Sequence, residues 1–373
     1  MKKLNTAFYN QLTKLFVVLV IAVIGFNIYQ TYSISTLYSE KLAEAEELAK
    51  PSKIELLVLE DSNCQDCFKI DTLVDAVLNM NVEILKNQKV DYNSAGNEIV
   101  KYGITKLPTI IITGETEKLK LSGFEQVEDA LVFTSPNLPY TLASSGNVLG
   151  RVTATIIEDE TCDKCIDLSA VYASLESQGI ALVSKNIVER NSAEGKKLLK
   201  NYPLKALPVL LLSKEFGKYQ VGIVENWDSI GEIAADGTYY TDIVAVPYIN
   251  LTTNKVMGLV NVYYIEDDSC PSCYNAESFN KPILNQMGLV FGKETIMYTS
   301  STDTKKLLEQ YNITKVPTIV LKGDTGLYPS LVQAWGPVGT IESDGAYILR
   351  KLDLLKQTYF DLEIGEVVRP LTS

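Results

Sequence analysis

The sequence predicts three tandem α/β domains, each with a central mixed sheet flanked by helices, after one N-terminal transmembrane helix. Two recurring patterns and one apolar segment support this prediction. A Cys-x-x-Cys pair follows a β-rich apolar run three times, and a Tyr stands six residues before a Pro that opens another such run three times. An uncharged apolar segment lies near the amino terminus. A chain of 373 residues has room for about two to four ordinary domains.

The composition narrows the chemistry. A net charge of −12 argues against a nucleic-acid partner and an anionic membrane surface, because both attract clustered Lys and Arg. The chain has no His, which removes Ser-His-Asp and Cys-His mechanisms and argues against a zinc hydrolase. All six Cys fall into the three Cys-x-x-Cys pairs, so cysteine serves one purpose three times.

The apolar segment LFVVLVIAVIGFNIY predicts a transmembrane signal-anchor over residues 15–32. Lysines precede the segment, and lysines stay on the cytoplasmic side of a membrane. We therefore expect residues 1–14 in the cytoplasm and the following domains outside it. The lysines are Lys2, Lys3 and Lys14.

Two alternatives compete with the signal-anchor. One is a cleaved signal peptide, although no convincing A-x-A site follows the apolar run. The other is a buried core helix, which is disfavoured because the segment is terminal and a charged stretch follows it. That stretch contains LYSEKLAEAEELA, a strong helix former, and predicts a helical stalk over residues 33–52.

Self-similarity divides the rest of the chain. Aligned on the cysteine pairs, three segments read IELLVLEDSNCQDCFKIDTL, VTATIIEDETCDKCIDLSAV and VNVYYIEDDSCPSCYNAESF. The second landmark reads YGITKLPTIII, YPLKALPVLLL and YNITKVPTIVL. The connectors PYTLASSGNVLGRV and PYINLTTNKVMGLV, rich in turn residues, separate the repeats. These landmarks predict domains over residues 53–145, 146–253 and 254–373.

Each repeat is expected to run strand, helix, strand, helix, strand, strand. The helix after the first cysteine pair has apolar positions at a 3.6-residue period. A strand–helix–strand beginning requires a parallel strand pair with a right-handed crossover. In the first repeat we expect strands at 54–59 and 82–85, helices at 67–80 and 98–102, and a hairpin of 109–113 with 119–122. In the third repeat we also expect a terminal amphipathic helix over 347–360.

A Cys-x-x-Cys after a strand, with an apolar residue and a Pro opening a later strand, resembles the thioredoxin-like family. The resemblance covers most of the chain beyond about residue 53, three times. Placed at a helix N-terminus, the first Cys would have its thiolate stabilised by the helix dipole and free N–H groups, and the second could resolve a mixed disulfide. The resemblance implies cis prolines that leave the preceding backbone free to bind an extended substrate. The residues are Cys64, Cys67, Cys162, Cys165, Cys270 and Cys273, with Pro108, Pro208 and Pro317.

The sequence departs from that family at two points. Asn63, Thr161 and Ser269 stand where thioredoxins have Trp, and the buried Asp six residues before the first Cys is also missing. A Glu-Asp pair recurs closer to each Cys-x-x-Cys instead. One hypothesis is that a carboxylate shuttles the proton of the second Cys; the favoured alternative is a strand-end residue beside a helix N-terminus. The candidates are Glu60, Glu158 and Glu266.

The dipeptides inside the pairs differ in charge. They are Gln-Asp in the first repeat, Asp-Lys in the second and Pro-Ser in the third. Negative charge beside a thiolate raises its pKa and stabilises the disulfide. We therefore expect Cys270–Cys273 to be the most oxidising and reactive pair and Cys64–Cys67 the most reducing.

The expected function is an extracytoplasmic thiol–disulfide oxidoreductase or isomerase. Its partners would be the thiols and disulfides of exported proteins, with a membrane redox partner also possible and no cofactor. A redox-inert scaffold or chaperone with three structural disulfides is the main alternative. A thiolate metal carrier is the weakest, because the pairs lie far apart and no His accompanies them, so we expect no metal site. Three aromatic residues after the prolines fit core packing better than an active-site role: Phe124, Trp227 and Trp335.

Overall fold

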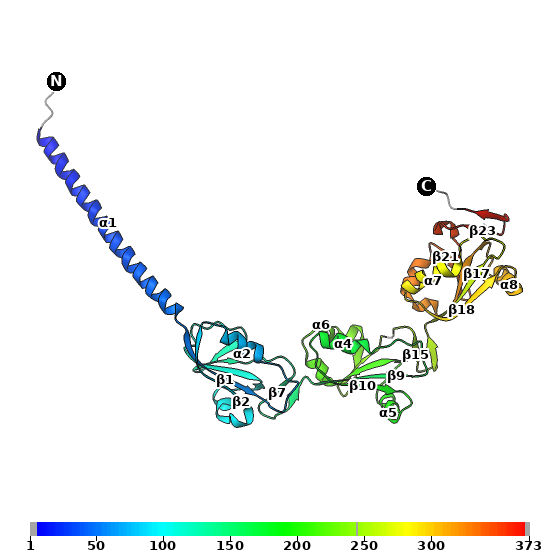
Figure 1. Cartoon of the computed structure of the whole chain (residues 1–373), viewed down its shortest axis with the longest axis horizontal. Coiled ribbons are helices and arrows are strands. Elements are labelled where there is room, and N and C mark those ends of the chain that lie inside the picture. The colour runs from blue at the N-terminus through cyan, green and yellow to red at the C-terminus, as the bar shows by residue number, and fades with distance from the viewer. Residues whose placement is uncertain (1–5, 244, 370–373) are drawn as a thin grey trace, which may run out of the picture. The chain divides into compact units, whose positions relative to one another are not determined.

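The computed structural model describes residues 6–243 and 245–369 (Figure 1). Lys2 and Lys3, on which the predicted orientation partly depends, lie outside the described residues. The chain divides into two compact units between Leu149 and Gly150. The first unit contains one of the predicted domains, and the second contains the other two.

The amino-terminal segment forms one continuous helix, α1 (Thr6–Ala49). The predicted span and stalk are therefore parts of a single element. Within the described residues, this is the one helix long and apolar enough to cross a membrane, over Asn10–Glu47. A signal sequence near the amino terminus can also be long and apolar enough to meet this requirement.

The first unit has a five-stranded sheet in the order β2-β1-β4-β6-β5. Strands β1 and β2 are parallel, and β4 and β6 follow in antiparallel pairing. The strands and helices are β1 (Ser52–Glu60), α2 (Asp71–Leu78), β2 (Val82–Asp91), η1 (Tyr92–Ser94), α3 (Gly96–Lys101), β3 (Lys106–Leu107), β4 (Thr109–Gly114), β5 (Phe124–Val127), β6 (Ala130–Phe133), β7 (Tyr140–Leu142) and β8 (Val148–Leu149).

The buried side chains of β1 show how the layers of this domain are arranged. Ile54, Leu56 and Val58 are buried with Val77 of α2 on one face of the sheet. Leu59 is buried on the opposite face among residues that include Tyr102, beside α3. Successive side chains of a strand point to opposite faces, so an apolar run without alternation indicates a strand covered on both sides.

Three expected elements differ from the structure. The helix expected over 67–80 begins only at Asp71. The partner of β4 is β6 rather than residues 119–122, because Leu119 packs into the core and the chain returns to the sheet later. In the third repeat, residues 347–360 form β22, a short 3-10 helix and the start of β23 instead of an amphipathic helix.

The second unit repeats the same sheet twice, in the orders β10-β9-β12-β14-β13 and β18-β17-β20-β22-β21. The first sheet and its helices comprise β9 (Val152–Glu158), α4 (Ala170–Ser177), β10 (Leu182–Glu189), α5 (Ala193–Asn201), β11 (Ala206–Leu207), β12 (Val209–Leu212), η2 (Lys214–Lys218), α6 (Gly222–Glu225), η3 (Trp227–Ser229), β13 (Gly231–Ile233), β14 (Tyr239–Thr241), β15 (Tyr248–Asn250) and β16 (Lys255–Met257). The second comprises β17 (Leu259–Glu266), α7 (Ala276–Gln286), β18 (Val290–Tyr298), α8 (Thr302–Gln310), β19 (Lys315–Val316), β20 (Thr318–Gly323), η4 (Thr325–Leu327), α9 (Pro329–Trp335), β21 (Gly339–Ile341), β22 (Tyr347–Leu349), η5 (Leu352–Leu355), β23 (Tyr359–Asp361) and β24 (Glu366–Val368).

The three sheets confirm the expected fold class: three tandem thioredoxin-like α/β domains after an apolar N-terminal helix. In each domain a parallel strand pair joined through a helix is extended by antiparallel strands. The two Trp residues pack in the core, as the favoured interpretation held. Trp227 and Trp335 are buried, and their indole N–H groups donate to the carbonyls of Glu232 and Thr340.

Candidate functional site

All six cysteines form disulfides within their own Cys-x-x-Cys pairs. Each pair lies in the loop that follows an interior strand of its sheet, β1, β9 or β17. In all three loops the N–H of the first Cys donates to the carbonyl of the Asp three residues earlier. In the second and third domains the N–H of the second Cys also donates to the carbonyl of the first, which closes a tight turn.

The expected placement of the first Cys at a helix N-terminus is wrong in all three domains. The helices begin later, at Asp71, Ala170 and Ala276. The segment between the cysteine pair and the helix makes other contacts. In the first domain the N–H of Phe68 donates to the carbonyl of Pro139 at 2.8 Å. Because a helix dipole acts only over the first turn, it does not stabilise the Cys64 thiolate here.

The structure does bring the cysteine pair of the first domain to its proline. Cys64, Cys67 and Pro108 line one cavity of about 60 Å³. The peptide bond before Pro108 is cis, as are those before Pro208 and Pro317. Two further cis bonds, before Pro139 and Pro247, belong to the connectors and had no sequence signal beyond the repeated Pro-Tyr.

The disulfides are little exposed to solvent. Relative exposure is 6% for Cys64, 7% for Cys67 and 6% for Cys270. Cys162 and Cys165 are half-buried. Attack on a disulfide requires access to a sulfur, so the second pair is the most accessible as the chain stands.

The three Glu candidates have different surroundings. Glu266 is buried and accepts hydrogen bonds from the N–H groups of Ala276 and Glu277 at the start of α7. Burial raises the pKa of Glu266 above its usual value, against the effect of those two bonds. Glu60 pairs with Lys89 at 2.8 Å, and Glu158 is the last residue of β9. These contacts match the strand-end interpretation.

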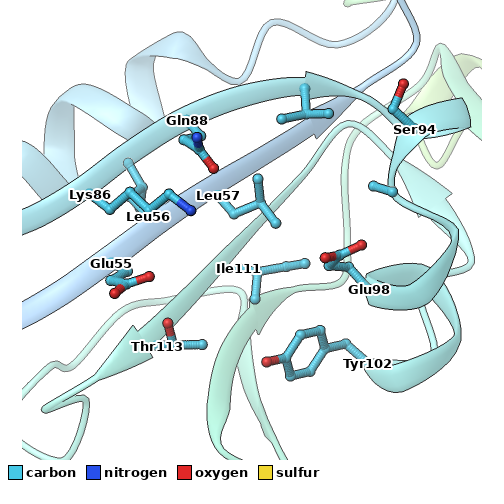
Figure 2. Close-up of a pocket in the computed structure, with 12 residues that line it drawn as sticks. Glu55, Leu56, Leu57, Lys86, Gln88, Ser94, Glu98, Tyr102, Ile111 and Thr113 are labelled. Carbon is cyan, nitrogen blue, oxygen red and sulfur yellow. The ribbon is translucent and has the colours of Figure 1, made fainter.

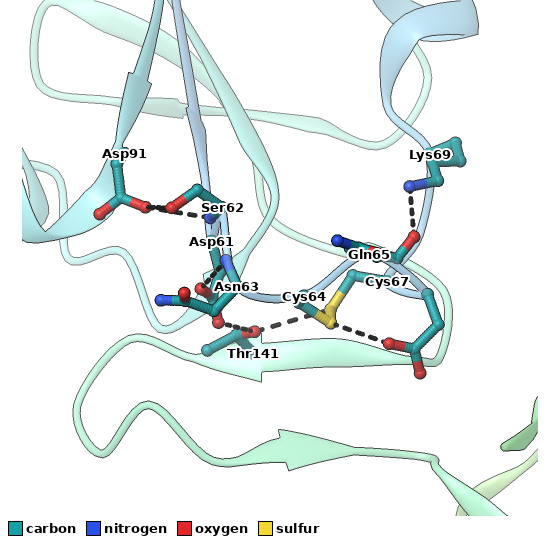
Figure 3. The surroundings of a disulfide bond; sticks show 10 residues. Asp61, Ser62, Asn63, Cys64, Gln65, Cys67, Lys69, Asp91 and Thr141 are labelled. Atoms are coloured by element: carbon teal, nitrogen blue, oxygen red, sulfur yellow. Dashed lines mark hydrogen bonds between the residues drawn. A yellow bond between two sulfur atoms is a disulfide. The ribbon is translucent and has the colours of Figure 1, made fainter. Parts of the chain in front are cut away.

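The Asp of each Glu-Asp pair is the residue that sequence reasoning missed. Figure 3 shows Thr141 beside the first disulfide, with its hydroxyl donating to Asp61 at 2.8 Å and lying 3.6 Å from Cys67 Sγ. In the second domain Asp159 pairs with Arg190 at 2.9 Å. The recurrence of Glu-Asp before each Cys-x-x-Cys was the available signal, but its partners are far away in sequence.

Polar groups inside the turns lie close to the first cysteines. Asp66 Oδ1 is 3.8 Å from Cys64 Sγ, and Ser272 Oγ is 3.7 Å from Cys270 Sγ. A carboxylate opposes a thiolate, whereas a hydroxyl can donate to one. Both contacts therefore agree with the order expected from the charges of the dipeptides, in which the thiolate is least favoured at Cys64.

A larger cavity of about 320 Å³ lies on the α3 side of the first sheet (Figure 2). Its lining mixes apolar side chains with Glu55, Lys86 and Glu98. No cysteine lines it, so it is separate from the disulfide site. Within the described residues, no three His, Cys, Asp or Glu side chains gather where they could hold a metal ion.

No family model matches the sequence, and no curated protein matches it. Among solved structures, the alkylhydroperoxide reductase AhpF of Enterococcus faecalis is 15% identical over 46% of this chain and 88% of that chain, with a TM-score of 0.17. ERdj5 form II is 13% identical over 77% of this chain and 39% of that chain, with a TM-score of 0.14. Human ERp44 form II is 13% identical over 74% and 78%, with a TM-score of 0.14. With values this low, the fold assignment rests on the strand order described above.

Each site combines a disulfide with a buried or paired Asp, and in the first domain the proline lines the same cavity as the disulfide. A disulfide in a loop at the end of a strand can accept a thiolate from another molecule through a mixed disulfide. In the first domain the reduced Cys67 would face a hydroxyl that leads to the carboxylate of Asp61. The chemistry that these groups share is thiol–disulfide exchange.

Proposed function

We propose that the chain is a membrane-anchored thiol–disulfide oxidoreductase or isomerase that exchanges disulfides with exported proteins outside the cytoplasm. The observation that carries this proposal is the cavity that Cys64 and Cys67 share with Pro108, together with the same order of Cys-x-x-Cys and proline in the other two domains. Exchange needs a sulfur pair beside a place for the reacting chain. The apolar α1 supports the membrane anchor.

The exchange conserves atoms and electrons at each step. A substrate thiolate attacks one sulfur of the pair, the other Cys leaves as a thiolate and takes a proton, and a mixed disulfide forms. A second substrate thiolate then attacks the substrate sulfur of that intermediate and frees the pair as a dithiol. Two electrons pass from the substrate to the pair, and a disulfide-bearing redox partner restores it. The reverse sequence reduces a substrate disulfide at the expense of a dithiol partner.

An insulin-reduction assay with dithiothreitol tests the proposal on the full chain in detergent micelles. We expect turbidity from precipitated insulin to develop faster with the chain than with dithiothreitol alone. Three matched variants, Cys64→Ser, Cys162→Ser and Cys270→Ser, divide the activity among the domains. The neutral Pro-Ser dipeptide leads us to expect the largest loss with Cys270→Ser.

A redox-inert scaffold with three structural disulfides is the second candidate. The low exposure of Cys64, Cys67 and Cys270 favours it, as does the absence of a helix N-terminus at these residues. In that case the chain would not accelerate insulin reduction, and all six sulfurs would resist alkylation under mild reduction. Such a result would replace the enzymatic proposal.

A further inference from the structure

A short strand stands immediately before each of the three site prolines, and it is already paired. Strands β3, β11 and β19 each join a hairpin of the same chain in a three-stranded sheet. The hairpin strands that pair with them are β7, β15 and β23. We call these three the cap strands. The residues opposite the pre-proline positions are Thr141 for Leu107, Ile249 for Leu207 and Phe360 for Val316.

The resemblance to the thioredoxin-like family implied that the backbone before each proline is free to bind a substrate. In this structure the cap strand is already paired with that backbone. The N–H of Ala143 donates to the carbonyl of Thr105 at 3.0 Å. In an antiparallel ladder, every second pair of opposite residues exchanges two backbone hydrogen bonds. Because Thr105 and Ala143 form one such pair, Leu107 and Thr141 form the next. The same bond recurs from Leu251 to Lys205 at 2.9 Å and from Leu362 to Thr314 at 2.7 Å.

The segment after each cysteine pair also bonds to the residue immediately before the cap strand. The N–H of Phe68 donates to Pro139 at 2.8 Å. The equivalent bonds run from Ile166 to Pro247 at 3.1 Å and from Tyr274 to Thr358 at 2.9 Å. The cap strand therefore pairs with the pre-proline strand along its length and is bonded at its start to the segment after the cysteine pair, and Figure 3 shows Thr141 of β7 beside the first disulfide.

Side chains fix the caps in place. In the first domain the carboxylate of Asp61 accepts a hydrogen bond from the hydroxyl of Thr141 in the cap strand. In the second, Arg190 bridges Asp159 and Asn254, which lies in the turn of the cap hairpin. Cation–π contacts also hold the caps of the first and third domains. The Nζ atom of Lys106 lies 5.0 Å from the ring centre of Tyr140, and that of Lys315 lies 5.2 Å from the ring centre of Tyr359.

We propose that the cap strands occupy the binding surface of an extended polypeptide, and that such a segment reaches each disulfide by displacing the cap. This inference rests on the proposed function. The surface offers one row of backbone groups beside the sulfurs, so it fits an unfolded segment that can form a strand. A tethered strand competes at high effective concentration. A cysteine fixed on a folded surface cannot replace it.

The test uses the full oxidised chain in detergent micelles and the synthetic peptide Pro-Tyr-Cys-Leu-Ala-Ser, blocked at both ends. Ala143→Pro removes the N–H that donates to Thr105, and Ala143→Ser keeps it as the matched control. Samples are quenched with acid, and the mixed disulfide at each pair is quantified by peptide mass spectrometry. Leu251→Pro and Leu362→Pro repeat the experiment in the other two domains.

We expect Ala143→Pro to accelerate reaction of the peptide at Cys64–Cys67 about fivefold, as one backbone hydrogen bond is lost. The other two pairs of the same molecules should react at wild-type rates, which shows that the variant is folded. Equal rates in Ala143→Pro, Ala143→Ser and wild type, with the peptide reacting readily, would overturn the inference and leave the proposed function standing.

Failure of the proposed function itself has a different result. In that case neither the peptide nor glutathione reacts with any pair in any variant, even where hydrogen exchange shows the amide of Phe68 newly exposed by Ala143→Pro. Protection of that amide therefore separates a cap that stays closed from a disulfide that does not react.

Discussion

At the scale of single residues, two carboxyl groups near the cysteine loops differ in their surroundings. The carboxylate of Asp66 lies 3.8 Å from Cys64 Sγ, and the carboxyl group of Glu266 is buried at the end of β17, the strand before the third pair. Both positions are charged in the sequence, but their effects differ. Asp66 is exposed and acts through space, whereas Glu266 is buried and responds to its own desolvation.

Asp66→Asn should make the first pair more oxidising. Two charges at this separation interact with about 1 kcal/mol in a water-like dielectric. We therefore expect the pKa of the reduced Cys64 thiol to fall by up to about one unit and the reduction potential to rise by about 20 mV. The pH dependence of alkylation and equilibrium with glutathione measure the two quantities. Asp75→Asn, at an exposed position on α2, is the control, and an equal shift in both variants contradicts the argument.

Glu266 should make the third domain less stable as the pH rises. Burial raises the pKa of the folded carboxyl, so its contribution is complete below about 4.5 and is lost as the pH rises through the raised value. Glu266→Gln keeps an acceptor for the N–H of Ala276 without the charge.

Urea unfolding from pH 4 to 7, followed by Trp335 fluorescence in a Trp227→Phe background, measures this effect. We expect the free energy of unfolding to fall with pH by at most about 1.4 kcal/mol per unit more in the parent than in Glu266→Gln. Parallel pH profiles for the two proteins would show that the carboxyl keeps its ordinary pKa.

At the scale of elements, a Trp packs against a Gly before the last sheet hairpin of the second and third domains. The sequences ENWDSIGEI and QAWGPVGTI align, and in both the indole packs against a glycine at the start of the next strand. The hairpins β13–β14 and β21–β22 turn at Asp236-Gly237 and Asp344-Gly345. A side chain at the strand glycine would push the Trp out of the core.

Gly339→Ala should therefore destabilise the third domain by about 1–3 kcal/mol. A Cβ at Gly339 would meet the carbonyl oxygen of Ile348 and lie 2.7 Å from Trp335 Nε1. Gly336→Ala is the matched control, since its Cβ would meet nothing within 4 Å. Hydrogen exchange in β17 and β20 measures the change for this domain alone. Equal protection in the two variants is incompatible with the packing described.

At the scale of the whole molecule, α1 is the element on which the proposed location depends. We expect the full-length chain to stay in the membrane after an alkaline wash, because an apolar helix of this length remains in the bilayer. Protease added to intact cells should digest the domains beyond α1, given the lysines before the apolar segment. A released chain lacking its first residues, found by mass spectrometry, would instead establish a cleaved signal sequence.

The amino-acid sequence alone predicted the three repeats, the fold class and the order of cysteine pair and proline within each repeat. These features follow from local patterns: strand and helix periods, turn residues and a fixed order of landmarks. They are legible because each repeat carries the same signals, as in IIED-x-x-C-x-x-C and its counterparts.

The surroundings of the disulfides became visible only in the folded chain. The late start of α2 depends on a bond from Phe68 to Pro139, 71 residues further along, and the paired edge before Pro108 depends on Thr141, 34 residues beyond Leu107. Backbone groups are alike in every residue, so a pairing over that distance leaves no local pattern that a sequence can reveal. For the same reason the sequence shows Asp61 only as a carboxylate at the end of a strand. Its hydrogen bond from Thr141 is visible only in the folded chain.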